Sequence, residues 1–349
     1  MKRIFVLHEY GAPTHYHALR VLARQHGQQV VFRIFDCLLD RAIVPKVKLA
    51  VRHPICMLQS ICFLLTLPLR KPTKIVLGIA PFNRHLPFLM KLLRKHQVYY
   101  HTSYSRWDGT RWVHQPSSAE LVSLWKNFTS QYVQHIFSVS EWTKNQLTKN
   151  AYATADRISV VNHSYTRRID ADANLPKKNS FLCVSSLTEW KGIPELLNIF
   201  TCHPEADITF VGKGPLKGLV ESYSQRFPNI SYAGYVQGAA NIMPIYARHS
   251  FLLLNSQRTD SWEELFGMVI IEAMACGCVP ITTDHPGPTE ILANGTDGII
   301  CKEGAIEKGI TKAIGMDNQE YANMRRRAIE KGHSYHCDLM ADRWAKIFS

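Results

Sequence analysis

Two glutamates eight residues apart stand on either side of a predicted helix start. Glu264 and Glu272 are separated by Leu-Phe-Gly-Met-Val-Ile-Ile, in which Gly267 is placed to open a helix that Gly277 can close. The first turn of such a helix offers free backbone N–H groups and a partial positive charge to a phosphate. A carboxylate beside it suits hydroxyl groups, such as those of a sugar or a ribose. The alternative, a solvated acid followed by an ordinary helix glutamate, stays open on these residues alone.

The elements that must position these glutamates alternate between strands and helices. Ser117 has capping-box spacing ahead of an amphipathic run to about residue 134, and Ser140 can cap the next helix. A polar, irregular stretch at residues 162–180 separates two such series and is interpreted as a linker. The predicted strands are residues 3–8, 29–35, 74–77, 135–139, 181–184, 207–211, 251–254 and 278–283, and the other helices are 16–25, 141–147, 193–200 and 334–348.

This alternation predicts an α/β protein of two Rossmann-like domains that face a central cleft. We expect a basic N-terminal domain at residues 1–168, a second domain at 169–333, and a C-terminal helix, 334–349, that returns to the first domain. Ligands of open parallel sheets lie at the carboxyl ends of the strands, so the cleft is the expected site.

Composition excludes several other classes of protein. The 349 residues are 46% hydrophobic and 20% charged, which is ordinary for a folded chain and excludes extensive disorder. Nine scattered cysteines without a CxxC pair favour reduced thiols in a cytosol over a zinc ribbon or a disulfide scaffold. The longest apolar stretch, residues 55–69, is too short and too polar to predict a transmembrane helix.

Positive charge is concentrated in the first half of the chain. Residues 1–170 carry a net charge of +16 and the remainder −3, and no acidic residue lies between Asp40 and Asp108. Eleven Lys or Arg fall within residues 41–95. A solvated basic face and a nucleic-acid patch are both open, but no nucleic-acid-binding module is visible. Cations that flank the apolar run favour contact with an anionic membrane surface through residues 41–95.

The segment that begins at Glu264 resembles the signature of family 4 retaining glycosyltransferases of the GT-B fold. The similarity extends over roughly residues 98–300, with a looser match in the first half. The matching segments are the Glu-x7-Glu block at 264–272, Val-Ser-Ser-Leu-Thr-Glu-Trp-Lys-Gly at 184–192, Val-Gly-Lys-Gly-Pro at 211–215, Asn-Ser at 255–256, Gly-Pro-Thr-Glu at 287–290, Asn-Gly-Thr-Asp-Gly at 294–298 and His-Thr-Ser at 101–103.

The resemblance implies roles for individual residues. Glu264 would contact the transferred sugar, Glu272 the ribose, Lys191 the diphosphate and His101 the C6 end of the sugar. The loop at residues 286–289 would close over the sugar and phosphate. The implied catalytic residues are therefore Glu264 and His101, and the implied nucleotide-binding positions are Lys191, Glu272, Gly212, Lys213, Gly214, Phe266, Gly267 and Pro288.

Two positions depart from the family pattern. Ser186 stands where the family usually has an arginine on the diphosphate, so Lys213, Arg258 or a residue of the first domain would have to replace it. The turn at residues 11–13, Gly-Ala-Pro, is less glycine-rich than the turn often seen there.

The activity implied by the resemblance is transfer of a hexosyl unit, with retention and without a metal or another cofactor. The expected donor is a nucleotide-sugar, with a UDP-sugar favoured. The expected acceptor is a lipid-linked or growing surface glycan (O-antigen, lipopolysaccharide core or capsule), and no nucleic acid is expected as a partner. The expected location is the cytoplasmic face of the inner membrane, as a peripheral protein. The alternatives are a small soluble acceptor or a catalytically idle GT-B binding subunit.

Three further groups of residues have two interpretations each. The pair Asp170 and Asp172 has the form of a metal site, but it lies in the predicted linker. The histidines at 15 and 17 could face the acceptor or could cap the surface of the first loop. Tyr104, Trp107 and Trp112 could stack on sugar faces or could cover a domain edge.

Overall fold

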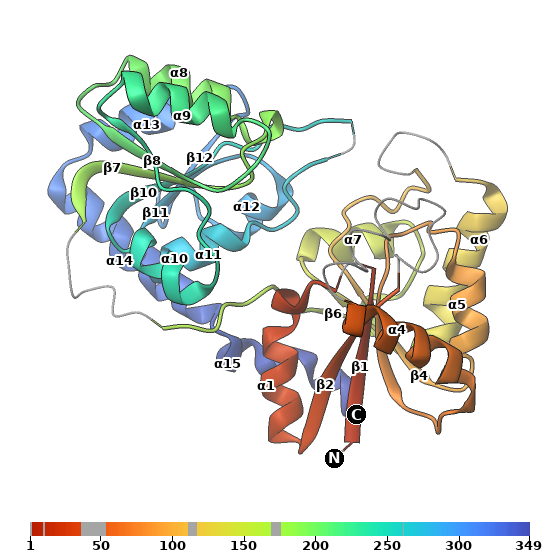
Figure 1. The fold of residues 1–349 in the computed structure, drawn as a ribbon. Coiled ribbons are helices and arrows are strands. Elements are labelled where there is room, and N and C mark those ends of the chain that lie inside the picture. The colour runs from red at the N-terminus through yellow and green to blue at the C-terminus, as the bar shows by residue number, and fades with distance from the viewer. Residues whose placement is uncertain (1, 10, 36–53, 111–116, 169–175, 261) are drawn as a thin grey trace. The chain divides into compact units, whose positions relative to one another are not determined.

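The computed structural model describes residues 2–9, 11–35, 54–110, 117–168, 176–260 and 262–349, and it divides the chain into two compact units (Figure 1). Unit 1 contains residues 1–164 and 337–349, and unit 2 contains residues 165–336. The expected boundaries, 168/169 and 333/334, lie four and three residues from these positions. Within the described ranges, no helix is both long enough and apolar enough to cross a membrane.

Unit 1 is built on a six-stranded parallel sheet with the order β2-β1-β3-β4-β5-β6. Helices α4 to α7 cover one face, and α1, α15 and η7 cover the other (Figure 1). The elements are β1 (Lys2–His8), η1 (Pro13–Tyr16), α1 (His17–Gln25), β2 (Gln28–Ile34), α4 (Pro54–Thr66), η2 (Leu67–Leu69), β3 (Lys74–Gly78), α5 (Leu86–Leu93), β4 (Gln97–Thr102), α6 (Ala119–Asn127), the π-helix η3 (Phe128–Tyr132), β5 (His135–Ser138), α7 (Glu141–Lys149), η4 (Ala155–Arg157), β6 (Ile158–Val160), α15 (Cys337–Met340) and η7 (Ala341–Ile347).

Unit 2 has a second six-stranded parallel sheet, with the order β12-β11-β10-β7-β8-β9. Helices α8, α9 and α13 pack on one face, and α10, α11 and α14 on the other (Figure 1). The elements are β7 (Lys177–Val184), η6 (Glu189–Lys191), α8 (Ile193–Thr201), β8 (Asp207–Val211), α9 (Lys217–Arg226), β9 (Ile230–Tyr232), α10 (Ala239–Tyr246), β10 (His249–Leu254), α11 (Met268–Ala275), β11 (Val279–Thr283), α12 (Pro286–Ile291), β12 (Ile299–Cys301), α13 (Ile306–Gly315) and α14 (Asn318–Ser334).

The predicted α/β class with two parallel sheets is confirmed, and most of the predicted elements are present. Both sheets are covered on two faces, which is why their strands are nearly continuous apolar runs rather than alternating ones. The Ser140 cap is confirmed, because its Oγ accepts the N–H of Thr143 at 3.1 Å. The α6 helix begins one residue later than expected, since its N-cap is Ser118 rather than Ser117, and the Ser118 hydroxyl accepts the N–H of Leu121.

Three local predictions need correction. The last residues of the predicted linker, 177–180, belong to β7, because their backbone pairs with neighbouring strands. The predicted loop at 286–289 is the start of helix α12, in which Pro286 occupies a first-turn position that lacks an N–H partner in any case. The single C-terminal helix is instead divided among the end of α14, α15 and η7.

Aromatic side chains fix two of these elements in unit 1. Trp344 of η7 is 1% exposed and packs its ring 4.5 Å from that of Phe137 and 5.3 Å from that of His101. Trp107 is fully buried, with its ring 4.9 Å from that of Tyr152. Trp107 is therefore a core residue and not a surface for sugar stacking. Trp112, the pair Asp170 and Asp172, and the cations Arg41, Lys46, Lys48 and Arg52 lie outside the described residues.

Candidate active site

An ion pair between Lys191 and Glu264 lies at the carboxyl edge of the sheet of unit 2. Lys191 ends η6, in the connection after β7, and Glu264 lies in the segment before α11. The Lys191 ammonium donates to Oε2 of Glu264, and both side chains are largely buried, at 13% and 14% exposed. The Ser256 hydroxyl also donates to this oxygen, at 3.2 Å, and the Trp262 ring centroid lies 4.4 Å from the Lys191 nitrogen. The pair is therefore held by three segments of the chain.

His285 fixes the backbone on which Glu264 is carried. Its Nδ1 accepts the Glu264 N–H at 3.0 Å, so its Nε2 carries the proton and donates to the carbonyl of Ser256 at 2.8 Å. The side chain is fully buried, and this burial, followed by the Arg258 charge, lowers the pKa of His285. A neutral imidazole thus bridges the end of β10 to the glutamate. Sequence analysis missed this residue, whose only visible signal is its place before the Pro-Gly-Pro at 286–288.

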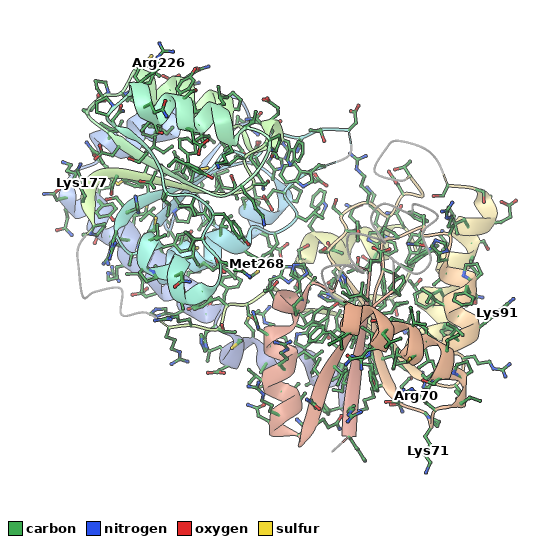
Figure 2. All side chains as sticks on the ribbon, in the orientation of Figure 1. Arg70, Lys71, Lys91, Lys177, Arg226 and Met268 are labelled. Atoms are coloured by element: carbon green, nitrogen blue, oxygen red, sulfur yellow. The ribbon has the colours of Figure 1, made fainter. Side chains whose placement is uncertain are left out.

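The start of α11 is pressed against the start of α12. Gly267 is the N-cap of α11 with φ of 91°, and the N–H of Gly287 donates to the Glu264 carbonyl at 3.2 Å. A Cβ on Gly287 would lie 2.4 Å from the nitrogen of Phe266, so only glycine allows this approach. The side chains of Phe266 and Pro288 are buried within unit 2 and support the turn. Figure 2 labels Met268, the first residue of α11.

The loop after β8 lies directly against the loop after β7. Gly212 has φ of 155°, and a Cβ there would lie 1.8 Å from the carbonyl oxygen of Ser185. Gly214 is exposed, but a Cβ there would lie 2.3 Å from the carbonyl oxygen of Leu187. Between them, Lys213 is exposed, and its ammonium lies 4.0 Å from the ring centroid of Tyr235. Both glycines are therefore required by the close approach of the two loops, and the turn presents one cation at this edge of the sheet.

Glu272 lies in the second turn of α11. The hydroxyl of Tyr246 donates to its Oε2 at 3.2 Å. Burial raises the pKa of Glu272 to about 7, against the smaller opposing effect of that hydrogen bond. Burial thus disfavours ionisation of this carboxyl group. A carboxyl group in such surroundings is a good candidate for binding hydroxyl groups of a ligand.

Two of the cations proposed to replace the missing arginine have different surroundings. Ser186 is exposed and brings no charge. Arg258 is engaged within unit 2, since its guanidinium lies 2.8 Å from Glu303 and 2.5 Å from the carbonyl of Asp284. Lys213 has no carboxylate within salt-bridge distance among the described residues. Of these two, Lys213 is the better placed to meet an anion.

Unit 1 contributes a separate cavity of about 220 Å³ at the carboxyl edge of its own sheet. His101 ends up buried at this edge, near the end of β4, and its Nδ1 lies 3.0 Å from the Tyr16 hydroxyl. Its Nε2 has no hydrogen-bond partner among the described residues. The cavity is lined by the last residues of β1, β3 and β4 and by residues that follow these strands, namely His8, Glu9, Ala12, His15, Gly78, Ile79, His101, Thr102, Ser103 and Tyr104.

The imidazoles around this cavity are kept neutral. Burial, and then the neighbouring His15, lowers the pKa of His8 to about 4. Burial, and then His17, lowers the pKa of His15 to about 4. Burial also holds the pKa of His101 well below its usual range. The ring of His15 packs 4.0 Å from that of His163, so His15 is a packed cavity residue and not a surface cap.

Glu9 is the one acid that lines this cavity. It is 4% exposed, and Nδ2 of Asn83 donates to its Oε1 at 2.7 Å. None of the ten lining residues is Lys or Arg, although unit 1 is strongly basic. Neutral imidazoles, hydroxyls and one carboxylate suit an uncharged, hydroxyl-rich ligand better than an anion.

Potential metal ligands gather at one place in the described ranges. Ligand atoms of the consecutive residues His336, Cys337 and Asp338 lie within 4.8 Å of one another, and Nε2 of His336 already lies 3.2 Å from the Thr166 carbonyl. These residues belong neither to the site around Lys191 and Glu264 nor to the cavity at His101.

The raised pKa of Glu272 predicts how the stability of the folded protein depends on pH. A folded-state pKa near 7, above the ordinary value of 4.5, means that the folded protein binds the extra proton. Stability is therefore lost as the pH rises from about 4.5 through 7, by up to about 3 kcal/mol. We expect Glu272→Gln to raise the urea unfolding midpoint at pH 8 and to have little effect at pH 5. An equal gain at both pH values would contradict the assignment.

Comparison with known proteins finds a family match in the second half of the chain. The model of the family described as glycosyl transferases group 1 matches residues 166–334. Sulfoquinovosyl transferase SQD2 of Arabidopsis thaliana is 23% identical over 210 residues, which are 59% of this chain and 39% of that protein. N-acetyl-alpha-D-glucosaminyl L-malate synthase of Bacillus anthracis is 26% identical over 152 residues, which are 42% of this chain and 39% of that protein. The chain thus matches about two fifths of the length of each relative.

Solved structures resemble the chain over its whole length. The Anabaena protein Alr3699/HepE, crystallised with UDP, has a TM-score of 0.71 at 17% identity, covering 100% of this chain and 99% of that one. The lipopolysaccharide outer core galactosyltransferase WaaB has a TM-score of 0.65 at 17% identity, with coverage of 100% and 99%. The Glu-x7-Glu signature lies within the matched segment: residues 166–334, which are nearly all of unit 2, match the glycosyl transferases group 1 family, and the chain as a whole has the GT-B fold of these structures.

Proposed function

We propose that this chain is a retaining glycosyltransferase that moves a hexosyl unit from a UDP-sugar to a lipid-linked or growing surface glycan. The observation that carries the proposal is the buried Lys191–Glu264 pair at the start of α11, with Glu272 in the second turn of the same helix. These groups match the two ends of a nucleotide-sugar: a cation and free N–H groups for diphosphate, and carboxylates for the hydroxyls of the sugar and ribose.

In this proposal each residue acts on a different part of the donor. The C1–O bond to the diphosphate breaks while a C1–O bond forms to the acceptor hydroxyl on the same face. The acceptor proton passes to the departing phosphate oxygen. Lys191, the α11 N–H groups and Lys213 stabilise the charge that develops on the diphosphate, so these groups supply the electrostatic stabilisation without a metal. Glu264 orients the sugar through its hydroxyls, and Glu272 binds the ribose.

The cavity of unit 1 supports the acceptor half of the proposal. Its volume of about 220 Å³ is of the size of one sugar ring, and its imidazoles are neutral donors or acceptors for hydroxyls. By the family resemblance, His101, whose buried Nε2 has no partner among the described residues, would meet the C6 end of the transferred sugar. Two similar proteins, a lipopolysaccharide outer core galactosyltransferase and a sulfoquinovosyl transferase, are sugar transferases by name.

A binding subunit without transfer activity is the second candidate. Ser186 favours it, because the diphosphate loses one arginine relative to the family pattern. A protein of this kind would bind a nucleotide-sugar and would neither transfer nor hydrolyse it. A transferase that acts on a small soluble acceptor would need no membrane contact.

Membrane contact is the remaining part of the proposal, and it is carried by the outer face of α4 and η2. The side chains of Ile55, Leu58, Leu65 and Leu69 are 62–85% exposed, and their spacing places them along one side of the helix. Lys71 and Lys91 point away from the body of unit 1 (Figure 2), and Arg70 lies over the ring of Phe63 at the end of the stripe. An apolar stripe flanked by cations suits the surface of an anionic leaflet, with the protein peripheral at the cytoplasmic face of the inner membrane.

The donor half is tested by transfer and binding across UDP-, GDP- and ADP-sugars in the presence of EDTA. We expect one UDP-sugar to bind and turn over.

Lys191→Met should weaken UDP binding at least tenfold, because the diphosphate loses its buried cation. Glu264→Gln should lower turnover at least tenfold and yet leave UDP binding equal or tighter, because Lys191 is released from its partner. The matched control is Lys308→Met on α13, an exposed lysine. Binding of no nucleotide-sugar, or equal losses in the control, would refute the donor site, and binding without turnover would favour the idle subunit.

The membrane half is tested by cosedimentation with vesicles of phosphatidylcholine and 30% phosphatidylglycerol. We expect Leu58→Ser with Leu65→Ser to weaken binding at least tenfold, because each exposed leucine loses on the order of 1 kcal/mol of apolar burial. Leu339→Ser on α15, 62% exposed, is the control and should bind as the wild type does. If the wild type does not bind vesicles, the proposed membrane contact is refuted and a soluble acceptor is favoured.

A further inference from the structure

A second, larger cavity of unit 1 lies at the opposite edge of its sheet. The cavity has a volume of about 720 Å³ and gathers the first residues of four neighbouring strands, β2, β1, β3 and β4, together with the segment after η2. Strand β1 has seven residues at about 3.3 Å each, so this edge lies about 20 Å from the His101 cavity. A ligand held here would therefore not be the acceptor that the proposed transfer uses.

The lining of this groove is cationic without a counter-charge. Five of its ten residues are Lys or Arg, and none is Asp or Glu. The five cations are Lys2, Arg3, Arg70, Lys71 and Lys74. Like charges that face one cavity repel one another, and an anion that enters relieves this repulsion. Accordingly, burial and the neighbouring Lys2 lower the pKa of Lys74.

Two of these cations are held in place by the fold. The ammonium of Lys74 donates to the carbonyl of Ile347 at 2.5 Å. The guanidinium of Arg70 donates to the Thr66 hydroxyl at 3.0 and 3.1 Å and lies 5.2 Å from the ring centroid of Phe63. Cations that are already positioned lose little side-chain freedom when they bind a ligand. The groove thus differs from a face of freely solvated lysines.

The groove continues directly into apolar surface. Arg70 lines the groove, and the preceding residue, Leu69, is 85% exposed at the end of the stripe that runs along α4 and η2. A ligand that fits both parts carries a negative charge and an apolar chain next to each other. An acidic phospholipid has this chemistry, whereas a free phosphate or a nucleotide would leave the apolar part uncovered.

We propose that this groove binds the headgroup phosphate of an acidic lipid, with the acyl chain laid over Leu69. The proposal rests on the membrane contact proposed above and gives it a defined lipid site. It places the lipid at the amino edge of the sheet, away from the His101 cavity, so this lipid anchors the protein and does not accept the sugar.

Monomeric short-chain lipid tests the site without a membrane. Dihexanoyl-phosphatidylglycerol, below its micelle concentration, should bind the full-length protein saturably with one site, as measured by calorimetry. Lys2→Gln with Lys71→Gln should weaken this binding about thirtyfold, from the loss of two cations near the phosphate. The matched control is Lys126→Gln with Lys149→Gln, two exposed lysines on other helices of unit 1. This control should bind within threefold of the wild type, and dihexanoyl-phosphatidylcholine should not bind.

Three outcomes would overturn the inference. Equal losses in the two double variants would mean a diffuse basic surface. Binding of inorganic phosphate as tight as that of the lipid would mean a phosphate site without a lipid. If the short-chain lipid does not bind, while vesicle binding by the wild type still depends on Leu58 and Leu65, the lipid site in this groove is refuted and the membrane contact is retained. Short-chain binding that persists in a protein that ignores vesicles would sustain the groove and refute the membrane contact instead.

Discussion

The ion pair between Lys191 and Glu264 is the constraint on which the candidate active site depends. A buried cation and a buried carboxylate each carry a large desolvation cost, and each is tolerable here because the other is present. The loops after β7 and β10, the His285 bridge and the turn at Gly287 all serve to bring these two groups together. A donor with a diphosphate and a sugar can replace both partners at once, because it offers an anion to the lysine and hydroxyls to the glutamate. In the proposed function, binding of the donor would separate the two groups that the ion pair holds together.

In unit 1, the two edges of the sheet differ in charge. Its sheet has neutral imidazoles and one carboxylate at the carboxyl edge, and five cations at the amino edge. The positive charge that dominates the sequence of this half therefore avoids the cavity in which an uncharged sugar is proposed to lie. The proposed membrane contact and the proposed acceptor binding would thus use different side chains of unit 1.

The sequence predicted the sheets, the order of most elements and the central glutamates, because these depend on local patterns. Covered parallel strands are continuous apolar runs, and Glu264 and Glu272 lie within one short motif. The capping residue of α6 and the helical character of residues 286–289 were wrong because small energetic differences between adjacent positions decide them. The imidazoles near His101 come from distant parts of the chain, and no spacing could reveal their packing. Trp107 was ambiguous because burial of an aromatic residue depends on neighbours such as Tyr152 that lie far along the sequence.

We infer that a bound nucleotide-sugar separates the Lys191–Glu264 pair. The diphosphate would then contact Lys191, and the sugar would contact Glu264. A crystal structure of the protein with UDP, compared with one of the unliganded protein, tests this claim most directly. The account predicts that the Lys191 ammonium leaves Oε2 of Glu264 and contacts the diphosphate, which also receives N–H groups from the first turn of α11, while the ribose lies on Glu272. UDP bound elsewhere, or bound here with the Lys191–Glu264 pair intact, would contradict it.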